Sequence, residues 1–110
     1  MDAFTALADP TRRRLVEILL DGERPAGDLA ARFDMSGAAV SQHLKVLREA
    51  HIVRVRRDAQ RRIYAIDGQG LAEVDAWVQR TKVFWHAALD DLERALDESS
   101  AHDKPKEPPR

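Results

Sequence analysis

The segment from Leu29 to Leu47 limits what this chain can fold into more than any other part of its 110 residues. Its pattern predicts two short helices joined by a tight turn over residues 34–36, the second helix covering 37–50. Ser36 stands just before that helix and is a residue type that caps helix N-termini. The apolar side chains that recur every three or four residues, and therefore share one face of the second helix, are Val40, Leu44 and Leu47. The segment is thus predicted to be a helix-turn-helix.

The opposite face of the second helix carries small and polar residues, a composition that suits entry into the major groove of DNA. Gln42 has an amide that can donate to and accept from adenine, and Ala38 is small enough to touch a thymine methyl group. We expect five residues to contact base edges: Gly37, Ala38, Ser41, Gln42 and His43. The alternative is that these side chains are only a solvated helix face.

A β-hairpin is predicted directly after this helix. Residues 52–58 alternate between apolar and basic side chains, and residues 61–66 alternate back. The connecting turn, 58–61, lacks glycine, so we expect a connection longer or looser than a two-residue type I′ turn. A helix-turn-helix followed by a basic hairpin predicts a winged helix, with the hairpin as the wing (residues 53–66). The fold class is mainly α with this small β-hairpin.

Charge is unevenly distributed although the formal net charge is only -1. Residues 40–66 contain seven basic and two acidic side chains, whereas residues 67–103 contain three basic and nine acidic ones. A basic surface beside an acidic helix favours a polyanionic partner at the basic side. We expect contacts to the DNA backbone or minor groove from Thr11, Arg12, Arg13, Ser36, Lys45, Arg56, Arg57, Arg61 and Arg62. The alternatives are a capped helix with solvated arginines and a hairpin edge protected by charge.

The remaining helices are expected over residues 2–8, 10–20, 25–33 and 71–96. The apolar positions of the last helix recur with a mean step near that of a coiled coil, which indicates a dimer seam rather than a ligand pocket. The predicted dimer interface comprises Phe4, Leu7, Leu71, Val74, Val78, Trp85, Leu89 and Leu92. We therefore expect one DNA-binding and dimerisation domain over 1–96 and a disordered polar tail over 97–110.

Several other functions are disfavoured by the sequence. The chain has no cysteine, no glycine-rich phosphate loop and no nucleophile motif, so we expect no enzyme, no catalytic residues and no cofactor. His86 and Asp90 are four residues apart and could share a metal ion, but two ligands make a weak site, and no metal site is predicted. No signal peptide or membrane-spanning run is recognisable, which predicts a cytoplasmic protein without a membrane partner.

Three stretches, residues 6–15, 39–50 and 61–64, resemble the ArsR/SmtB family of bacterial winged-helix repressors. The resemblance covers roughly residues 3–96 and is closest to the branch without a recognisable metal site. It implies a homodimer that binds a palindromic operator and commonly represses its own operon. The sequence departs from the family at His51 and at Ala59-Gln60, where glycine is frequent.

The sequence therefore predicts a sequence-specific DNA-binding regulator of transcription. Two alternatives stay open at this point: a repressor that responds to a metal, an organic effector or a partner protein, and a winged helix used only for protein interaction. A protein-interaction module would lack the steep salt dependence that accompanies neutralisation of DNA phosphates.

Overall fold

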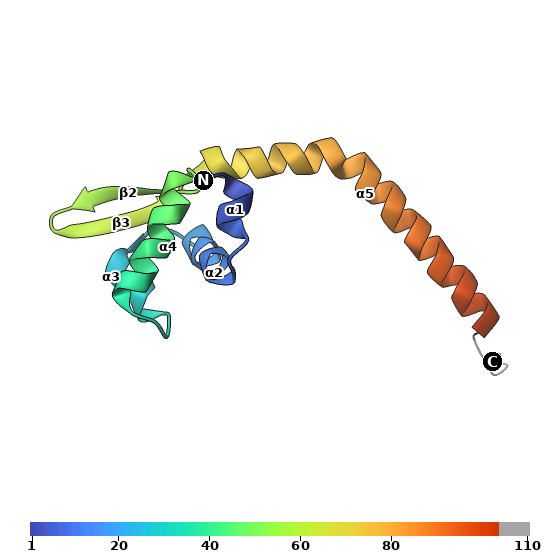
Figure 1. Cartoon of the computed structure of the whole chain (residues 1–110), viewed down its shortest axis with the longest axis horizontal. Helices are drawn as coiled ribbons and strands as arrows, with labels where there is room; N and C mark the ends of the chain where they lie inside the picture. The colour runs from blue at the N-terminus through green and yellow to red at the C-terminus, as the bar shows by residue number, and fades with distance from the viewer. Residues whose placement is uncertain (104–110) are drawn as a thin grey trace. The chain divides into compact units, whose positions relative to one another are not determined.

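The computed structural model describes the backbone of residues 1–103 and the side chains of residues 1–99. The chain forms two compact units, Met1–Ala76 and Trp77–Arg110. Its elements, labelled in Figure 1, are α1 (Ala3–Leu7), α2 (Pro10–Leu20), β1 (Arg24–Pro25), α3 (Ala26–Ala31), α4 (Gly37–Glu49), β2 (Val53–Asp58), β3 (Arg61–Ile66) and α5 (Gly68–Asp103). The winged helix-turn-helix predicted from the sequence is confirmed.

The first two helices begin directly after acidic residues that cap them. The carboxylate of Asp2 accepts a hydrogen bond from the backbone N–H of Thr5 at 2.8 Å. The carboxylate of Asp9 accepts from Thr11 N at 2.8 Å and from Arg12 N at 3.1 Å. Because the first N–H groups of a helix lack intrahelical partners, these side chains set where α1 and α2 start.

The sheet has one strand more than expected. Antiparallel pairing gives the order β1-β3-β2, with Arg24 opposite Tyr64 and Pro25 opposite Ile63. The helix expected from Pro25 therefore begins at Ala26, after β1, and ends at Ala31 rather than Phe33. Proline is tolerated in β1 because this strand lies at an edge of the sheet, where a missing N–H breaks no ladder.

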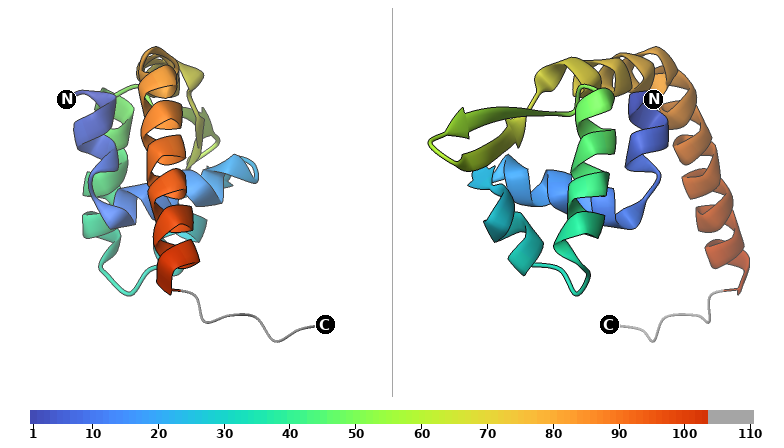
Figure 2. Two further views of the ribbon diagram at one scale, coloured as in Figure 1. Left: turned by 90° about the vertical axis from the view of Figure 1, so that its right-hand side faces the viewer. Right: turned by 60° about the vertical axis from the view of Figure 1, so that its left-hand side comes forward.

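The core of the first unit is aliphatic and centres on α4. Val40, Leu44 and Leu47 are at most 1% exposed, as the spacing predicted. They pack with buried side chains of α2 and α3, including Leu15 and Leu29. Helix α4 also contacts α1, and the two lie side by side in Figure 2. Burial of this face leaves the other side of α4 at the surface.

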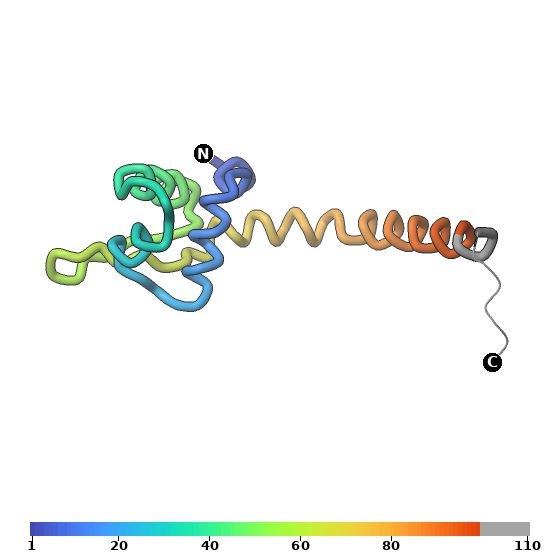
Figure 3. Tube along the Cα trace, turned by 90° about the horizontal axis from the view of Figure 1, so that it is seen from below, coloured from blue at the N-terminus to red at the C-terminus, as the bar shows by residue number. Residues whose placement is uncertain are grey.

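The wing closes through two residues, Ala59 and Gln60, so the longer or looser turn expected from the sequence is wrong. Ala59 adopts a positive φ of 57°, which substitutes for the missing glycine. Asp58 and Arg61 are paired across the strands and form a salt bridge of 3.2 Å, which holds the tight turn closed. The tip lies beyond the helices of this unit in Figure 3.

His51 likewise takes a positive φ, 59°, directly after α4. The helix therefore ends in a left-handed residue at a position that glycine usually occupies, at a cost of about 1 kcal/mol. Its neighbour Ile52 is completely buried and turns the chain into β2.

Helix α5 is longer at both ends than the predicted 71–96. Its start is set by Asp67, whose carboxylate accepts from Gln69 N at 3.0 Å. At the other end the helix continues to Asp103, so residues 97–103, expected in a disordered tail, are helical. No glycine or proline occurs between Gly70 and Pro105, which explains the extension. The rest of the expected tail, 104–110, lies outside the described residues.

The predicted dimer residues fall into two groups. Leu7, Leu71 and Val74 are partly buried against the core of the first unit. Five others expose 40–59% of their surface; they are Phe4, Val78, Trp85, Leu89 and Leu92.

Within the second unit the Trp85 indole N–H donates to Thr81 Oγ1 at 2.8 Å. Trp85 also packs edge-on against Phe84, with ring centroids 5.1 Å apart. The helix thus carries an ordered, solvent-exposed aromatic surface.

Gly70 is where α5 fits against the end of α4, and we predict that Gly70→Ala destabilises the fold. The Gly70 N–H donates to His51 O at 2.7 Å, and an added Cβ would lie 2.5 Å from Ala50 O and 2.7 Å from His51 O. Neither backbone oxygen can yield easily, so we expect a loss of about 2 kcal/mol in urea unfolding. Gly68→Ala is the matched control, because nothing lies within 4 Å of its Cβ. Equal stabilities for the two variants would contradict this account.

Candidate nucleic-acid interface

The polar face of α4 is exposed at the positions predicted from the sequence. Gly37, Ala38, Ser41, Gln42 and Lys45 are exposed, whereas His43 is half-buried. The Ser36 hydroxyl accepts from Ala39 N at 3.1 Å and so serves as the helix cap. Most of the predicted base-contact residues therefore share one accessible surface.

This surface continues into a groove between α4 and β3, with a volume of about 300 Å³. Three of its side chains are cationic: Lys45, Arg48 and Arg62. The full lining is Ala38, Ser41, Gln42, Lys45, Arg48, Arg62 and Tyr64. The fold thus brings base-reading candidates and cations from two separate elements into one concave surface. Such a groove suits a phosphodiester backbone, because the cations would neutralise its charge.

Two residues of the groove, Arg48 and Tyr64, were not predicted as site residues. Tyr64 is only 5% exposed, yet its hydroxyl has no hydrogen-bond partner among the described residues and is not sealed from solvent. A phenolic hydroxyl in this position can donate to an anionic oxygen. Arg48 follows Lys45 by one helical turn, a signal that could have revealed it. Tyr64 carried no such signal, because its place in β3 predicted an inward-facing core residue.

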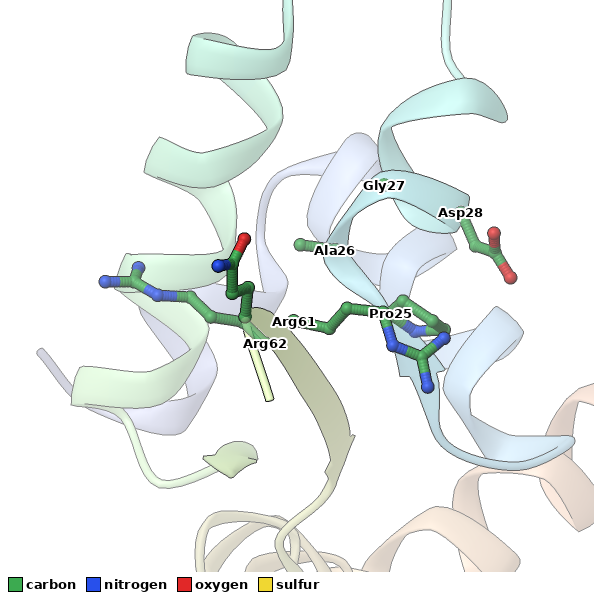
Figure 4. A pocket seen from close by; sticks show the side chains of 7 residues that line it. Pro25, Ala26, Gly27, Asp28, Arg61 and Arg62 are labelled. Atoms are coloured by element: carbon green, nitrogen blue, oxygen red, sulfur yellow. The ribbon is translucent and has the colours of Figure 1, made fainter. Parts of the chain in front are cut away.

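The four predicted wing arginines lie on two different faces. Arg57 and Arg62 are directly opposite each other in the β2–β3 register. Directly opposed residues of antiparallel strands point to the same side, so both lie on the face of the groove. Arg56 and Arg61 belong to the other face, since successive residues alternate. In the close-up of Figure 4, Arg61 extends toward Pro25 while Arg62 runs the opposite way.

The two predicted site arginines of the second face, Arg56 and Arg61, are paired with carboxylates. Arg56 lies 2.6 Å from Glu23, and Arg61 lies 3.2 Å from Asp58. The hydrogen bond from Arg56 lowers the pKa of Glu23, and Glu23 in turn raises the pKa of Arg56. No carboxylate in the described part of the chain forms a salt bridge with Arg57 or Arg62. The positive charge available to a polyanion is therefore concentrated on the groove face.

A larger cavity, about 510 Å³, lies between the start of α3 and the tip of the wing and is drawn in Figure 4. Its lining residues are Pro25, Ala26, Gly27, Asp28, Gln60, Arg61 and Arg62. Its lining includes the carboxylate of Asp28, which would repel a phosphate. This cavity is therefore a less favourable phosphate-binding site than the smaller groove.

At the N-terminus of α2 the structure favours a capped helix over N–H groups free for phosphate, the two alternatives that the sequence left open. The N–H groups of Thr11 and Arg12 donate to the Asp9 carboxylate, and that of Arg13 donates to Asp9 O. These hydrogen bonds, with Arg12 N the largest contributor, lower the pKa of Asp9 and keep it ionised.

The side chains of the two arginines bind the C-terminal carbonyl groups of α1. Arg13 Nη1 donates to Leu7 O at 2.8 Å and to Ala8 O at 3.0 Å, and Arg12 Nε donates to Ala6 O at 2.6 Å. Cationic donors are favourable partners for carbonyl groups that a helix end leaves without N–H groups. Both arginines therefore have a structural role in addition to any contact with DNA.

In the described residues, groups of three or more His, Cys, Asp or Glu side chains that could hold a metal ion do not occur. None of the helices described combines the length and apolar character needed to cross a bilayer.

Comparison with known proteins identifies the family. Residues 9–55 match the pattern of the family described as bacterial regulatory protein, arsR family. The chain is 43% identical over 95 residues to the HTH-type transcriptional regulator Rv2034 of Mycobacterium tuberculosis, covering 86% of each protein. It is 32% identical over 77 residues to the transcriptional repressor SdpR of Bacillus subtilis, covering 70% of this chain and 86% of SdpR.

Solved structures that are similar to this chain are likewise described as possible transcriptional regulators. A crystal structure of a possible transcriptional regulator for arsenical resistance superimposes with a TM-score of 0.70 at 43% identity, covering 89% of this chain and 96% of the other. The homodimeric winged helix-turn-helix DNA-binding domain of Mb0332 from Mycobacterium bovis gives a TM-score of 0.60 at 30% identity, covering 73% and 74%. With its winged fold and its cationic groove, this chain belongs to the arsR family of bacterial regulatory proteins and is a DNA-binding regulator of transcription.

Proposed function

We propose that the protein is a homodimeric repressor that binds a palindromic operator and blocks transcription by occupying it. The observation that carries this proposal is the cationic groove between α4 and β3, which adjoins the exposed polar face of α4. One surface then offers both base-reading side chains and phosphate-binding cations, the combination that sequence-specific DNA binding requires.

In this proposal α4 lies in the major groove, where Gly37, Ala38, Ser41 and Gln42 meet base edges. Gln42 would form paired hydrogen bonds with adenine, and the small residues at the helix start let the backbone approach closely. The sugar-phosphate backbone beside that contact would lie in the groove against Lys45, Arg48 and Arg62. Arg57, on the same face of the wing, would contact the flanking backbone or minor groove.

Dimerisation is proposed from the exposed apolar surface of α5. Trp85, Leu89 and Leu92 each expose 44–59% of their surface in the isolated chain, an unfavourable state for large apolar side chains in water. The similar domain of Mb0332 is described as homodimeric. Two subunits related by a two-fold axis would place two recognition helices in successive major grooves, about 34 Å apart, which requires an inverted repeat.

Selection of bound fragments from a random DNA pool tests the fold, the dimer and the function together. We expect an inverted repeat whose half-sites are about one helical turn apart. Binding to that repeat should weaken steeply with salt. Absence of any enriched motif, together with salt-independent binding, would overturn the proposal.

Repression is tested by placing the selected operator, or the promoter of the gene for this protein, upstream of a reporter. Co-expression of the protein should lower reporter output, and scrambling one half-site should restore it. Increased output would identify an activator and reject the occlusion mechanism.

Gln42→Ala should relax base preference at one or two positions of each half-site. Loss of a paired amide–base contact costs about 1–3 kcal/mol, so the affinity for the selected operator should fall while non-specific affinity is retained. Competition binding with operators substituted at single positions measures this. Retention of full affinity and preference would remove Gln42 from the readout.

Two pairs of arginines should differ in their effect on salt dependence. Arg48→Ala with Arg62→Ala removes two groove cations, so the slope of log affinity against log salt should become shallower by about two per subunit. Arg56→Ala with Arg61→Ala removes the same formal charge from the face paired with Glu23 and Asp58 and should change the slope little. Equal effects of the two double variants would show that the groove face has no special role.

Trp85→Glu should convert the dimer to monomers, as measured by sedimentation equilibrium, because it places a charge in the proposed apolar seam. Val83→Glu is the matched control: Val83 is 81% exposed and, two residues away on a helix, points about 200° from Trp85. A Trp85→Glu protein that stays dimeric would place the interface elsewhere.

A further inference from the structure

Arg12 joins three elements of the first unit through a single side chain. Its Nε donates to Ala6 O in α1 at 2.6 Å, and its Nη1 lies 3.2 Å from Nδ1 of His43 in α4. Its own backbone N–H is held by Asp9 at the start of α2. Both Arg12 and His43 are half-buried, so neither side chain is a freely solvated surface group.

The contact between Arg12 and His43 has only one possible polarity. A guanidinium carries donors and no acceptor, and it stays protonated in proteins. The Nδ1 atom of His43 must therefore accept the hydrogen bond, which requires that it carry no proton. A neutral imidazole with a bare Nδ1 has its proton on Nε2. The arrangement thus selects one of the two neutral tautomers.

The other ring nitrogen of His43 is available. Nε2 has no hydrogen-bond partner among the described residues and is not sealed from solvent. His43 directly follows Gln42, at the edge of the exposed polar face of α4. An N–H group at this edge can donate to an acceptor but cannot accept from a donor.

We propose that Arg12 is a positioning residue that fixes the tautomer of His43 with its proton on Nε2, so that α4 presents a hydrogen-bond donor at position 43. The tautomer is a property of the free protein. The further step, that the Nε2–H group of His43 donates to an acceptor on DNA, rests on the proposed function. The acceptor is an oxygen of a phosphate or an acceptor atom of a base edge, such as guanine N7 or O6 or thymine O4.

This role differs from the phosphate contact expected for Arg12 from the sequence. A phosphate contact depends on the charge of Arg12, whereas the positioning role depends on where its two donors point. Lysine conserves the charge, but its single ammonium on a flexible side chain cannot reproduce the rigid arrangement of Nε and Nη1 in the planar guanidinium group. Arg12→Lys therefore separates the two roles, and Arg14→Ala, which removes an exposed arginine paired with Glu17 on the same helix, is the matched control.

The first test uses the free, uniformly ¹⁵N-labelled full chain. Long-range ¹H–¹⁵N correlation spectra at mildly alkaline pH should show His43 with its proton on Nε2 alone. Arg12→Ala and Arg12→Lys should give a mixture of tautomers, and Arg14→Ala should leave the spectrum unchanged. A proton on Nδ1 in the unaltered chain, or an unchanged His43 pattern in both Arg12 variants, would overturn the proposal. Thermal unfolding confirms that each variant is folded before it is interpreted.

The second test is a double-mutant cycle on the operator obtained by selection. His43→Ala should weaken binding about tenfold, the loss of one charge-assisted or base contact. Arg12→Ala should weaken it by about twofold, because a mixture of tautomers still offers the donor part of the time. The double variant should be no weaker than His43→Ala, because Arg12 acts only through His43. Arg12→Lys should also weaken binding although it retains the charge. Additive losses, or full affinity of Arg12→Lys, would reject the positioning role.

The two sources of the acceptor are distinguished in the same cycle. A changed base preference in His43→Ala identifies a base edge, and an equal loss on all sequences identifies a phosphate. Failure of the unaltered chain to select any DNA would count against the proposed function. The spectra of the free protein would still decide whether Arg12 sets the tautomer.

Discussion

Burial of one face of α4 is the constraint on which the interface depends. Val40, Leu44 and Leu47 are locked into the core, which fixes the rotation of the helix about its axis. With that rotation fixed, the residues half a turn away, including Ala38 and Gln42, can only face outward. If α4 could rotate about its own axis, no single set of its side chains would be presented to base edges. The apolar residues therefore determine which polar residues can meet DNA.

The wing shows how sheet pairing sorts side chains that are alike in sequence. Four arginines fall within seven positions, but pairing in the antiparallel register separates them into two faces. On one face Glu23, from the loop before β1, and Asp58 balance the charge of Arg56 and Arg61. On the other face Arg62 joins Arg48 of α4 in the groove. Charge density in sequence is thus a poor guide to charge available at the surface.

Arg12 and Arg13 illustrate the same point at the other end of the domain. Both were expected to bind phosphate from the start of α2, where Asp9 in fact occupies the N–H groups. Their guanidinium groups bind the carbonyl groups that end α1, a helix too short to satisfy its own termini. Because Arg12 also contacts His43, one residue both anchors α1 and positions a side chain at the edge of the exposed face of α4.

The sequence by itself determined the helices with clear caps and clear periodicity, the apolar face of α4, the hairpin strands and the basic character of the region from Lys45 to Arg62. Those features are local, since capping, a repeat of three or four residues and strand alternation are set by near neighbours in the chain. Only the tertiary structure decided the β1 strand, the two-residue turn at Ala59, the inclusion of Arg48 and Tyr64 in the groove, and the pairing of Arg56 with Glu23. Each of these depends on residues distant in sequence meeting across the sheet or between α4 and β3, and no local pattern encodes which partners will face each other.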